Sequence, residues 1–171
     1  DIDGEKIIID FLTTTYDGPE DSLMHKFSEE ISAIQTEGLG LAFINPIQCH
    51  VQRVSPEKTI AEEVINVCRP VAYIVLKAFD KRRKDKDIYD LVYVLENYKD
   101  GVSSVISEIL DDDLKAESFK KSIDCLDRHF RDINYIGPVA YGNFLSNRTV
   151  IPQAFALVRD FLGHVKKMLV Q

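Results

Sequence analysis

Carboxylates near the start of the chain have a spacing that could support metal and phosphate chemistry. Asp1 and Asp3 form an Asp-x-Asp pair, and carboxylates of this kind present magnesium to nucleotide phosphates. Asp3 is followed by Gly4, however, and Asp-Gly is a strong signal for a hairpin turn. We therefore assign the pair to a turn. Asp10, at the end of a run of isoleucines, is the better candidate for chemistry.

A lysine within an apolar helix is the second candidate. Residues 71–79 are apolar on nearly every side of a predicted helix, which indicates that the helix is buried. Lys77 lies within this run. A lysine in such a position must extend to solvent, pair with a carboxylate or face a ligand.

Two aspartates follow in the next predicted helix, which begins near Lys86. Its apolar stripe consists of Ile88, Leu91, Leu95 and Tyr98. At about 100° per residue, Asp87 falls inside this stripe and Asp90 lies on its edge, so both need cations. The candidate cations are Lys77, Arg82 and Lys84. Asp87 could instead cap the first helical turn, whereas Asp90 lies a full turn further along.

Composition limits the class of protein. The chain has 171 residues, is 45% hydrophobic, and carries a net charge of -7. This charge argues against a protein that coats nucleic acid with its whole surface, although the basic run 81–84 could form a local phosphate-binding patch or a solvated surface. No apolar run reaches the ~20 residues of a membrane span. Cys49, Cys68 and Cys125 are far apart in the sequence, which favours a reducing, cytoplasmic compartment.

The expected elements divide the chain into two parts, and the predicted fold class is α+β. Residues 1–69 are predicted to form a small partial sheet, and residues 70–171 a helical bundle. Predicted strands cover residues 6–12, 40–46, 47–54 and 63–68. Predicted helices cover residues 22–38, 70–83, 86–98, 101–110, 115–130, 138–145 and 152–170. The helix at 22–38 rests on the helical spacing of Leu23, Phe27, Ile31 and Ile34.

Several of these motifs together resemble a nucleotidyltransferase family. Ile9-Asp10-Phe11-Leu12 looks like the family's strand that ends in an aspartate. Lys77, Arg82 and Lys86-Asp87-Ile88-Tyr89-Asp90-Leu91 look like its later helix with lysine, arginine and K/R-D-x-x-D-L. The family is that of the AbiEii-type toxins, which are DNA polymerase β-like enzymes, and the resemblance covers most of the chain.

The resemblance implies transfer of a nucleoside monophosphate from a nucleoside triphosphate to an acceptor. Three carboxylates would hold two Mg²⁺ ions, of which one activates the attacking hydroxyl and the other binds the triphosphate. Asp10 would be the third of these metal-binding carboxylates. Asp87 and Asp90 would belong to the catalytic signature on the helical side. Lys77, Arg82 and Lys86 would contact phosphate, or Lys77 and Arg82 would anchor Asp87 and Asp90.

The family's Gly-Ser or Gly-Gly turn with its Asp-x-Asp strand should precede Asp10, and it does not occur in this sequence. We therefore expect a C-terminal portion of such an enzyme, inactive by itself because one carboxylate cannot hold two metal ions. The acceptor could be RNA, protein or a small molecule, and an antitoxin or RNA could be a partner. Alternatives are a non-catalytic helical interaction module and a degenerate regulator. An exposed sheet edge would also favour a homodimer.

Overall fold

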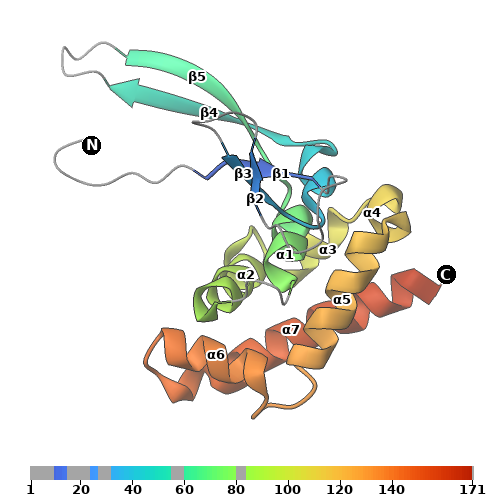
Figure 1. Ribbon diagram of the computed structural model, residues 1–171. Helices are drawn as coiled ribbons and strands as arrows, with labels where there is room; N and C mark the ends of the chain where they lie inside the picture. The colour runs from blue at the N-terminus through green and yellow to red at the C-terminus, as the bar shows by residue number, and fades with distance from the viewer. Residues whose placement is uncertain (1–9, 15–23, 27–31, 55–59, 80–83, 171) are drawn as a thin grey trace.

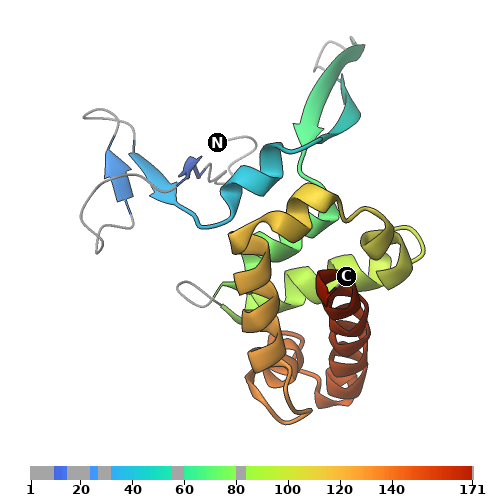
Figure 2. The same ribbon diagram turned by 90° about the vertical axis from the view of Figure 1, so that its right-hand side faces the viewer.

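The structure combines a helical body with two small sheets that project from it (Figures 1 and 2). It is a computed structural model that describes residues 10–14, 24–26, 32–54, 60–79 and 84–170. The sheets are formed before residue 68 and the helical body after it, which confirms the predicted α+β class. None of the described helices is long and apolar enough to cross a membrane.

The helical body begins with Pro70, which occupies the first turn of its first helix, where the missing N–H costs nothing. The longest helix is the last, and its apolar side faces the other helices. The bounds are α1 Pro70–Ala78, α2 Asp85–Asn97, α3 Val102–Ser107, α4 Asp111–Lys115, α5 Glu117–His129, α6 Ile136–Phe144 and α7 Ile151–Val170.

The core of the molecule lies between these helices. α2 packs against α1, α6 and α7, and α5 crosses both α1 and α7. Large apolar side chains from α1, α2, α5 with its C-terminal end, and α7 meet there and are fully buried. They include Ile74, Ile88, Leu91, Leu95, Phe119, Phe130 and Phe161. The apolar stripe predicted for α2 is thus the stripe that faces the core, which fixes the direction of the helix's charged side.

The first sheet has three short strands in the order β1-β3-β2. Their bounds are β1 Leu12–Thr13, β2 Met24–Lys26 and β3 Ser32–Gln35. The central strand, β3, pairs in parallel with β1 and antiparallel with β2. A short 3-10 helix, η1 (Leu39–Phe43), then leads toward the second sheet.

The second sheet is a hairpin of β4 (Ile47–Val54) and β5 (Ile60–Val67), which extends away from the helical body (Figures 1 and 2). Eight residue pairs run from Ile47 opposite Val67 to Val54 opposite Ile60. Neither strand has another partner among the described residues. Because side chains alternate between faces, Ile47, Cys49 and Val51 share one face with Ile65 and Val67.

A buried ion pair joins the hairpin's end to the helical body. Arg69, just before α1, pairs with Asp113 of α4 at 2.7 Å, and both side chains are almost completely buried. The same guanidinium donates hydrogen bonds to the carbonyl oxygens of Ile44 and Glu108. Asp113 also accepts from the backbone N–H of Leu110 at 2.8 Å. The connection therefore holds η1, α1 and α4 together at one point.

Two predicted elements are wrong. The helix expected at 22–38 is replaced, in the described residues, by β2 and β3. Leu23, Phe27 and Ile31 lie outside the described residues, and Ile34 sits in a central strand. Strand pairing with β1 outweighs the weak helical spacing there. The strand expected at 40–46 is instead largely a 3-10 helix, η1. Gly38 before this helix and Asn45 after it both have positive φ angles, which bend the backbone out of the extended conformation of a strand.

Other boundaries shift by smaller amounts. The helix predicted at 70–83 ends at Ala78, because Phe79 is extended. Residues 80–83, including the predicted phosphate ligand Arg82, lie outside the described residues. The helix predicted at 101–110 is shorter, and the acidic run Asp111–Asp113 starts a separate helix, α4. The predicted turn at Asp3-Gly4 and most of the predicted strand at 6–12 also fall outside the described residues.

Candidate functional site

Lys77 lies in the last turn of α1, beside the first two turns of α2. Its ammonium group makes two ion pairs, with Asp87 Oδ1 at 2.8 Å and with Asp90 Oδ2 at 3.0 Å. The side chains of all three residues are partly buried. Of the three candidate cations Lys77, Arg82 and Lys84, the structure therefore pairs Lys77 with both inward-facing aspartates. The lysine does not simply extend to solvent.

Both interpretations of Asp87 hold at once, since its two oxygens have different partners. While Oδ1 pairs with Lys77, Oδ2 accepts the backbone N–H of Lys84 at 2.8 Å, which caps the start of α2. Asp90 has a second cation, because Lys86 lies one helical turn earlier and reaches it at 2.8 Å. Asp87, Lys77, Asp90 and Lys86 thus form a chain of four alternating charges.

Tyr73 completes this group, which we call the Lys77 cluster (Tyr73, Lys77, Lys86, Asp87 and Asp90). The Lys77 ammonium lies 5.5 Å from the centre of the Tyr73 ring, one turn earlier on α1. Burial raises the pKa of the Tyr73 hydroxyl, and the neighbouring Asp90 carboxylate raises it further while Lys77 opposes the change. The tyrosine therefore stays a neutral hydrogen-bond donor at the edge of the cluster.

Protonation within the cluster follows from these contacts. Partial burial by itself would lower the pKa of Lys77, but the hydrogen bonds to Asp87 and Asp90 outweigh it and raise that pKa. Burial acts to raise the pKa of Asp90, and the hydrogen bonds from Lys86 and Lys77 hold it below its usual range. The lysine is consequently charged at neutral pH and Asp90 is ionised. Lys77 cannot act as a general base in this arrangement.

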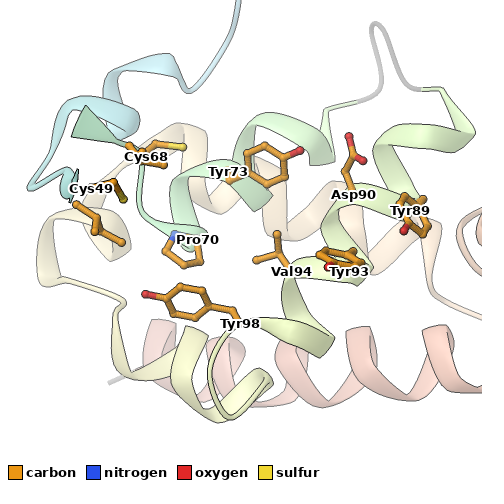
Figure 3. A pocket seen from close by; sticks show the side chains of 11 residues that line it. Cys49, Cys68, Pro70, Tyr73, Tyr89, Asp90, Tyr93, Val94 and Tyr98 are labelled. Carbon is orange, nitrogen blue, oxygen red and sulfur yellow. The ribbon is translucent and has the colours of Figure 1, made fainter. Parts of the chain in front are cut away.

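An apolar cavity opens beside the cluster, between the base of the hairpin and helices α1 and α2 (Figure 3). Its volume is about 570 Å³. We call it the tyrosine cavity, because four tyrosines from two helices and the following turn contribute to its wall. Its lining comprises Ile47, Cys49, Val67, Cys68, Pro70, Tyr73, Tyr89, Asp90, Tyr93, Val94 and Tyr98.

The cavity's walls come from distinct elements. Figure 3 shows Tyr73 on α1 facing Val94 and Tyr93 on α2, with Tyr98 below Pro70. Tyr98 is held by a hydrogen bond from its hydroxyl to Glu108 at 2.6 Å. At the other end, the Tyr89 ring stacks on Phe144 of α6. These contacts fix two of the rings before any ligand arrives.

Asp10, the predicted metal ligand, is not part of this group. It is exposed and lies just before β1, and among the described residues it makes no hydrogen bond or ion pair with the Lys77 cluster. Within the ranges the structure describes, no three His, Cys, Asp or Glu side chains are gathered as a metal ion would need. The described carboxylates therefore do not by themselves fit the two-magnesium arrangement that the resemblance implies.

The sequence interpretation missed two features of the site. The tyrosine cavity forms only because the base of the hairpin lies against α1 and α2. Such a contact joins segments that are separated in the sequence, so no local pattern of residues predicts it. The recurrence of tyrosine at 89, 93 and 98 was the one available hint. The Arg69–Asp113 pair was also missed, because Asp113 stands in a run of three aspartates and Arg69 next to a proline, both of which are typical of helix boundaries.

No family model, curated protein or solved structure matches this chain. The Lys77 cluster and the tyrosine cavity are therefore the features that bear on the function.

Proposed function

We propose that the chain forms the helical side of a nucleotidyltransferase site, which binds a nucleoside triphosphate and places its phosphates against Lys77. The observation that carries the proposal is that Lys77, a charged lysine, is held by Asp87 and Asp90, and Asp90 also lines an open cavity. The family resemblance of the Lys77 to Asp90 segment supports the same reading. The acceptor would be RNA, protein or a small molecule.

The hydrogen-bond capacity of Lys77 supports contact with phosphate. An ammonium group has three N–H donors, and two of them go to Asp87 and Asp90. One donor remains for an oxygen of a ligand, and the two carboxylates fix the direction in which it points. Lys86, exposed and paired with Asp90, supplies a second positive charge nearby. Asp87 and Asp90 then act by holding the two lysines in place.

Other parts of the reaction would lie outside this cluster. The resemblance implies Mg²⁺ with the triphosphate and Asp10 as one of its ligands, but the described carboxylates do not gather around Asp10, so we propose only the binding of the triphosphate. Arg82 is proposed as a further phosphate contact. Because the resemblance gives this chain only one of the three metal-binding carboxylates, we expect it to transfer no nucleotide on its own.

Binding of nucleotide to single-residue variants tests the proposal. In calorimetric titrations with a magnesium nucleoside triphosphate, Lys77→Met should weaken binding about tenfold, since one charge-assisted hydrogen bond to phosphate is lost. Lys121→Met is the matched control, because Lys121 is an exposed lysine of α5 that pairs with Glu37, away from the cavity. Equal affinities for the wild type and Lys77→Met would contradict the proposal.

A transfer assay with labelled nucleotide and magnesium tests the expected inactivity. No label should pass to RNA, to protein or to the chain itself. Transfer by this chain alone would show that one described carboxylate is enough, and would overturn the expectation of inactivity.

A second candidate, an interaction module, is favoured by the hairpin. One of its faces presents Val51, Ile65 and Val67, all substantially exposed, and both strand edges lack partners among the described residues. Such a surface is typical of an interface, here with a second copy of the chain. Sedimentation velocity should then show a dimer that the double variant Val51→Thr/Ile65→Thr dissociates. A monomer at all concentrations would exclude this candidate.

A further inference from the structure

The Lys77 cluster and the tyrosine cavity share two residues. Tyr73 lies beside the Lys77 ammonium and also lines the cavity, and Asp90 pairs with Lys77 and also lines the cavity. A ligand whose anionic group contacts the remaining donor of Lys77 would therefore reach the cavity with the part attached to that group. The site as a whole has one charged end and one apolar end.

We propose that the tyrosine cavity holds the base of the nucleotide whose phosphates contact Lys77. This inference rests on the proposed function and adds the part of the substrate that the charged cluster cannot explain. A nucleotide matches both ends, because its phosphates are anionic and its base is planar and mainly apolar on its two faces.

The lining favours a planar ring over an aliphatic chain. Tyr73, Tyr93 and Tyr98 present rings from α1, α2 and the turn after α2 (Figure 3). Aromatic side chains bind bases of every sequence by stacking, because each base has a π face. The remaining lining residues are mostly small and apolar, and they exclude water from the edges of the ring. A volume of about 570 Å³ is within the usual range for sites of small molecules.

Tyr93 is the ring we assign to stacking. Its side chain is about half exposed, so it is not needed to complete the core, and it lies one turn after Tyr89 on α2. The hairpin closes the opposite side of the cavity with Val67, which is also exposed in part. Substitutions at these two positions should alter the cavity without unfolding the helical body.

Calorimetric titration with three kinds of probe tests the inference. The probes are each of the four ribonucleoside triphosphates, the matching nucleosides, and inorganic tripolyphosphate. For the wild type, at least one nucleoside triphosphate should bind about tenfold more tightly than tripolyphosphate, which carries the phosphates without a base. Tyr93→Ala should remove most of this difference while the affinity for tripolyphosphate stays the same.

Two further variants complete the design. Val67→Trp should fill the cavity from the hairpin side and abolish the same difference. Tyr135→Ala is the matched control, since it removes a tyrosine that contacts Arg131 at the start of α6, away from the cavity lining. Its affinities should equal those of the wild type. Circular dichroism of every variant confirms that the helices remain folded.

The outcomes separate this inference from the proposed function. If nucleotide binding depends on Lys77 but Tyr93→Ala and Val67→Trp leave the nucleotide-to-tripolyphosphate ratio unchanged, the base lies elsewhere and the inference is wrong. If nucleosides bind and both cavity variants abolish this binding while Lys77→Met has no effect, the cavity holds the base but the phosphate contact of the proposed function is wrong. Absence of any difference between nucleotides and tripolyphosphate in the wild type overturns the inference.

Discussion

The helical body and the β4–β5 hairpin treat their apolar residues in opposite ways. Ile88, Leu91 and Leu95 of α2 are completely buried among the other helices. In the hairpin, Val64 is 53% exposed and Ile65 48% exposed, although both belong to a regular eight-pair ladder. The same kinds of side chain thus stabilise one region and remain in contact with solvent in the other.

The difference in burial shows that the helical body can be stable by itself, whereas the hairpin cannot. Burial of apolar area contributes about 25 cal/mol per Å², so the helices gain stability from every residue of their stripe. A hairpin of two strands is only marginally stable in water without a third strand or a helix against its face. Among the described residues, the hairpin is covered only at its base, where it lies against α1 and α2, and it depends on that attachment. The tyrosine cavity lies at this boundary between the two regions.

The largest expected effect concerns the joint between them. Arg69→Met should leave Asp113 buried without its cation, and removing one partner of a buried ion pair costs about 3–5 kcal/mol. The hairpin base, α1 and α4 should loosen together because the hydrogen bonds to Ile44 and Glu108 are also lost. Urea unfolding followed by circular dichroism measures the change in free energy of unfolding.

The double variant Arg69→Met/Asp113→Leu is the control for this prediction. It removes both charges together, so it should be clearly more stable than Arg69→Met alone. If the single variant is as stable as the wild type, the pair does not join the two regions, and the comparison between them loses its structural link.

The next effect comes from truncating the same kind of residue in each region. Leu91→Ala should reduce the free energy of unfolding by about 2–5 kcal/mol, because it leaves a void in the packed core of the body. Val64→Ala in the hairpin should change it by less than about 0.5 kcal/mol, because its side chain is already half in solvent. A comparable loss at both positions would show that the face of the hairpin carrying Val64, opposite the face of Val51 and Ile65, is also covered in solution.

Sequence reasoning worked best where local signals and packing agree. The long amphipathic helices were predicted to within a few residues, since Pro70 and the stripe of Ile88, Leu91 and Leu95 define both the start and the buried side. The same geometry made Lys77 one of three candidate cations for Asp87 and Asp90, and the structure shows that it pairs with both.

Prediction failed where distant parts of the chain decide the structure. The short strand containing Ile34 exists because β1 and β2 pair with it, and no spacing within residues 22–38 indicates this. The tyrosine cavity requires the side chains of Ile47 and Val67 to be set against Tyr73, which depends on the angle between hairpin and helices. The partner of Arg69 lies 44 residues away.

A smaller effect is expected at the Lys77 cluster. Lys77→Met leaves two partly buried carboxylates with one fewer cation, and partial exposure to solvent reduces the cost to about 1 kcal/mol. Asp90→Asn in the Lys77→Met background should recover part of this loss, since one unpaired charge is removed. A double-mutant cycle from thermal unfolding measures the coupling. A coupling of zero would mean that the cluster contributes nothing to the joining of α1 and α2.

The smallest effect is the response of the helical body to acid. Burial acts to raise the pKa of Asp90, Glu108 and Asp127. Hydrogen bonds from lysine outweigh it and help to hold all three pKa values below the usual range. A carboxylate with a lower pKa in the folded state stabilises the fold above its unfolded pKa of about 4. That stability is lost as the pH falls through the lowered folded value, when the carboxylate is protonated.

We therefore expect the melting temperature to be nearly constant between pH 7 and pH 5 and to fall by roughly 2–4 °C as the pH approaches 3. All three carboxylates belong to helical elements or their ends, so amide exchange in α2, α5 and α7 should accelerate as the lysine and arginine contacts of Asp90 and Asp127 are lost. Asp127→Asn, which removes the partner of Arg159 and Lys166, should flatten this acid response in α5 and α7 while leaving it intact in α2. The prediction is wrong if Asp127→Asn leaves the acid response unchanged and only amides of the hairpin exchange faster. The pH-sensitive contacts would then stabilise the hairpin rather than the helical body.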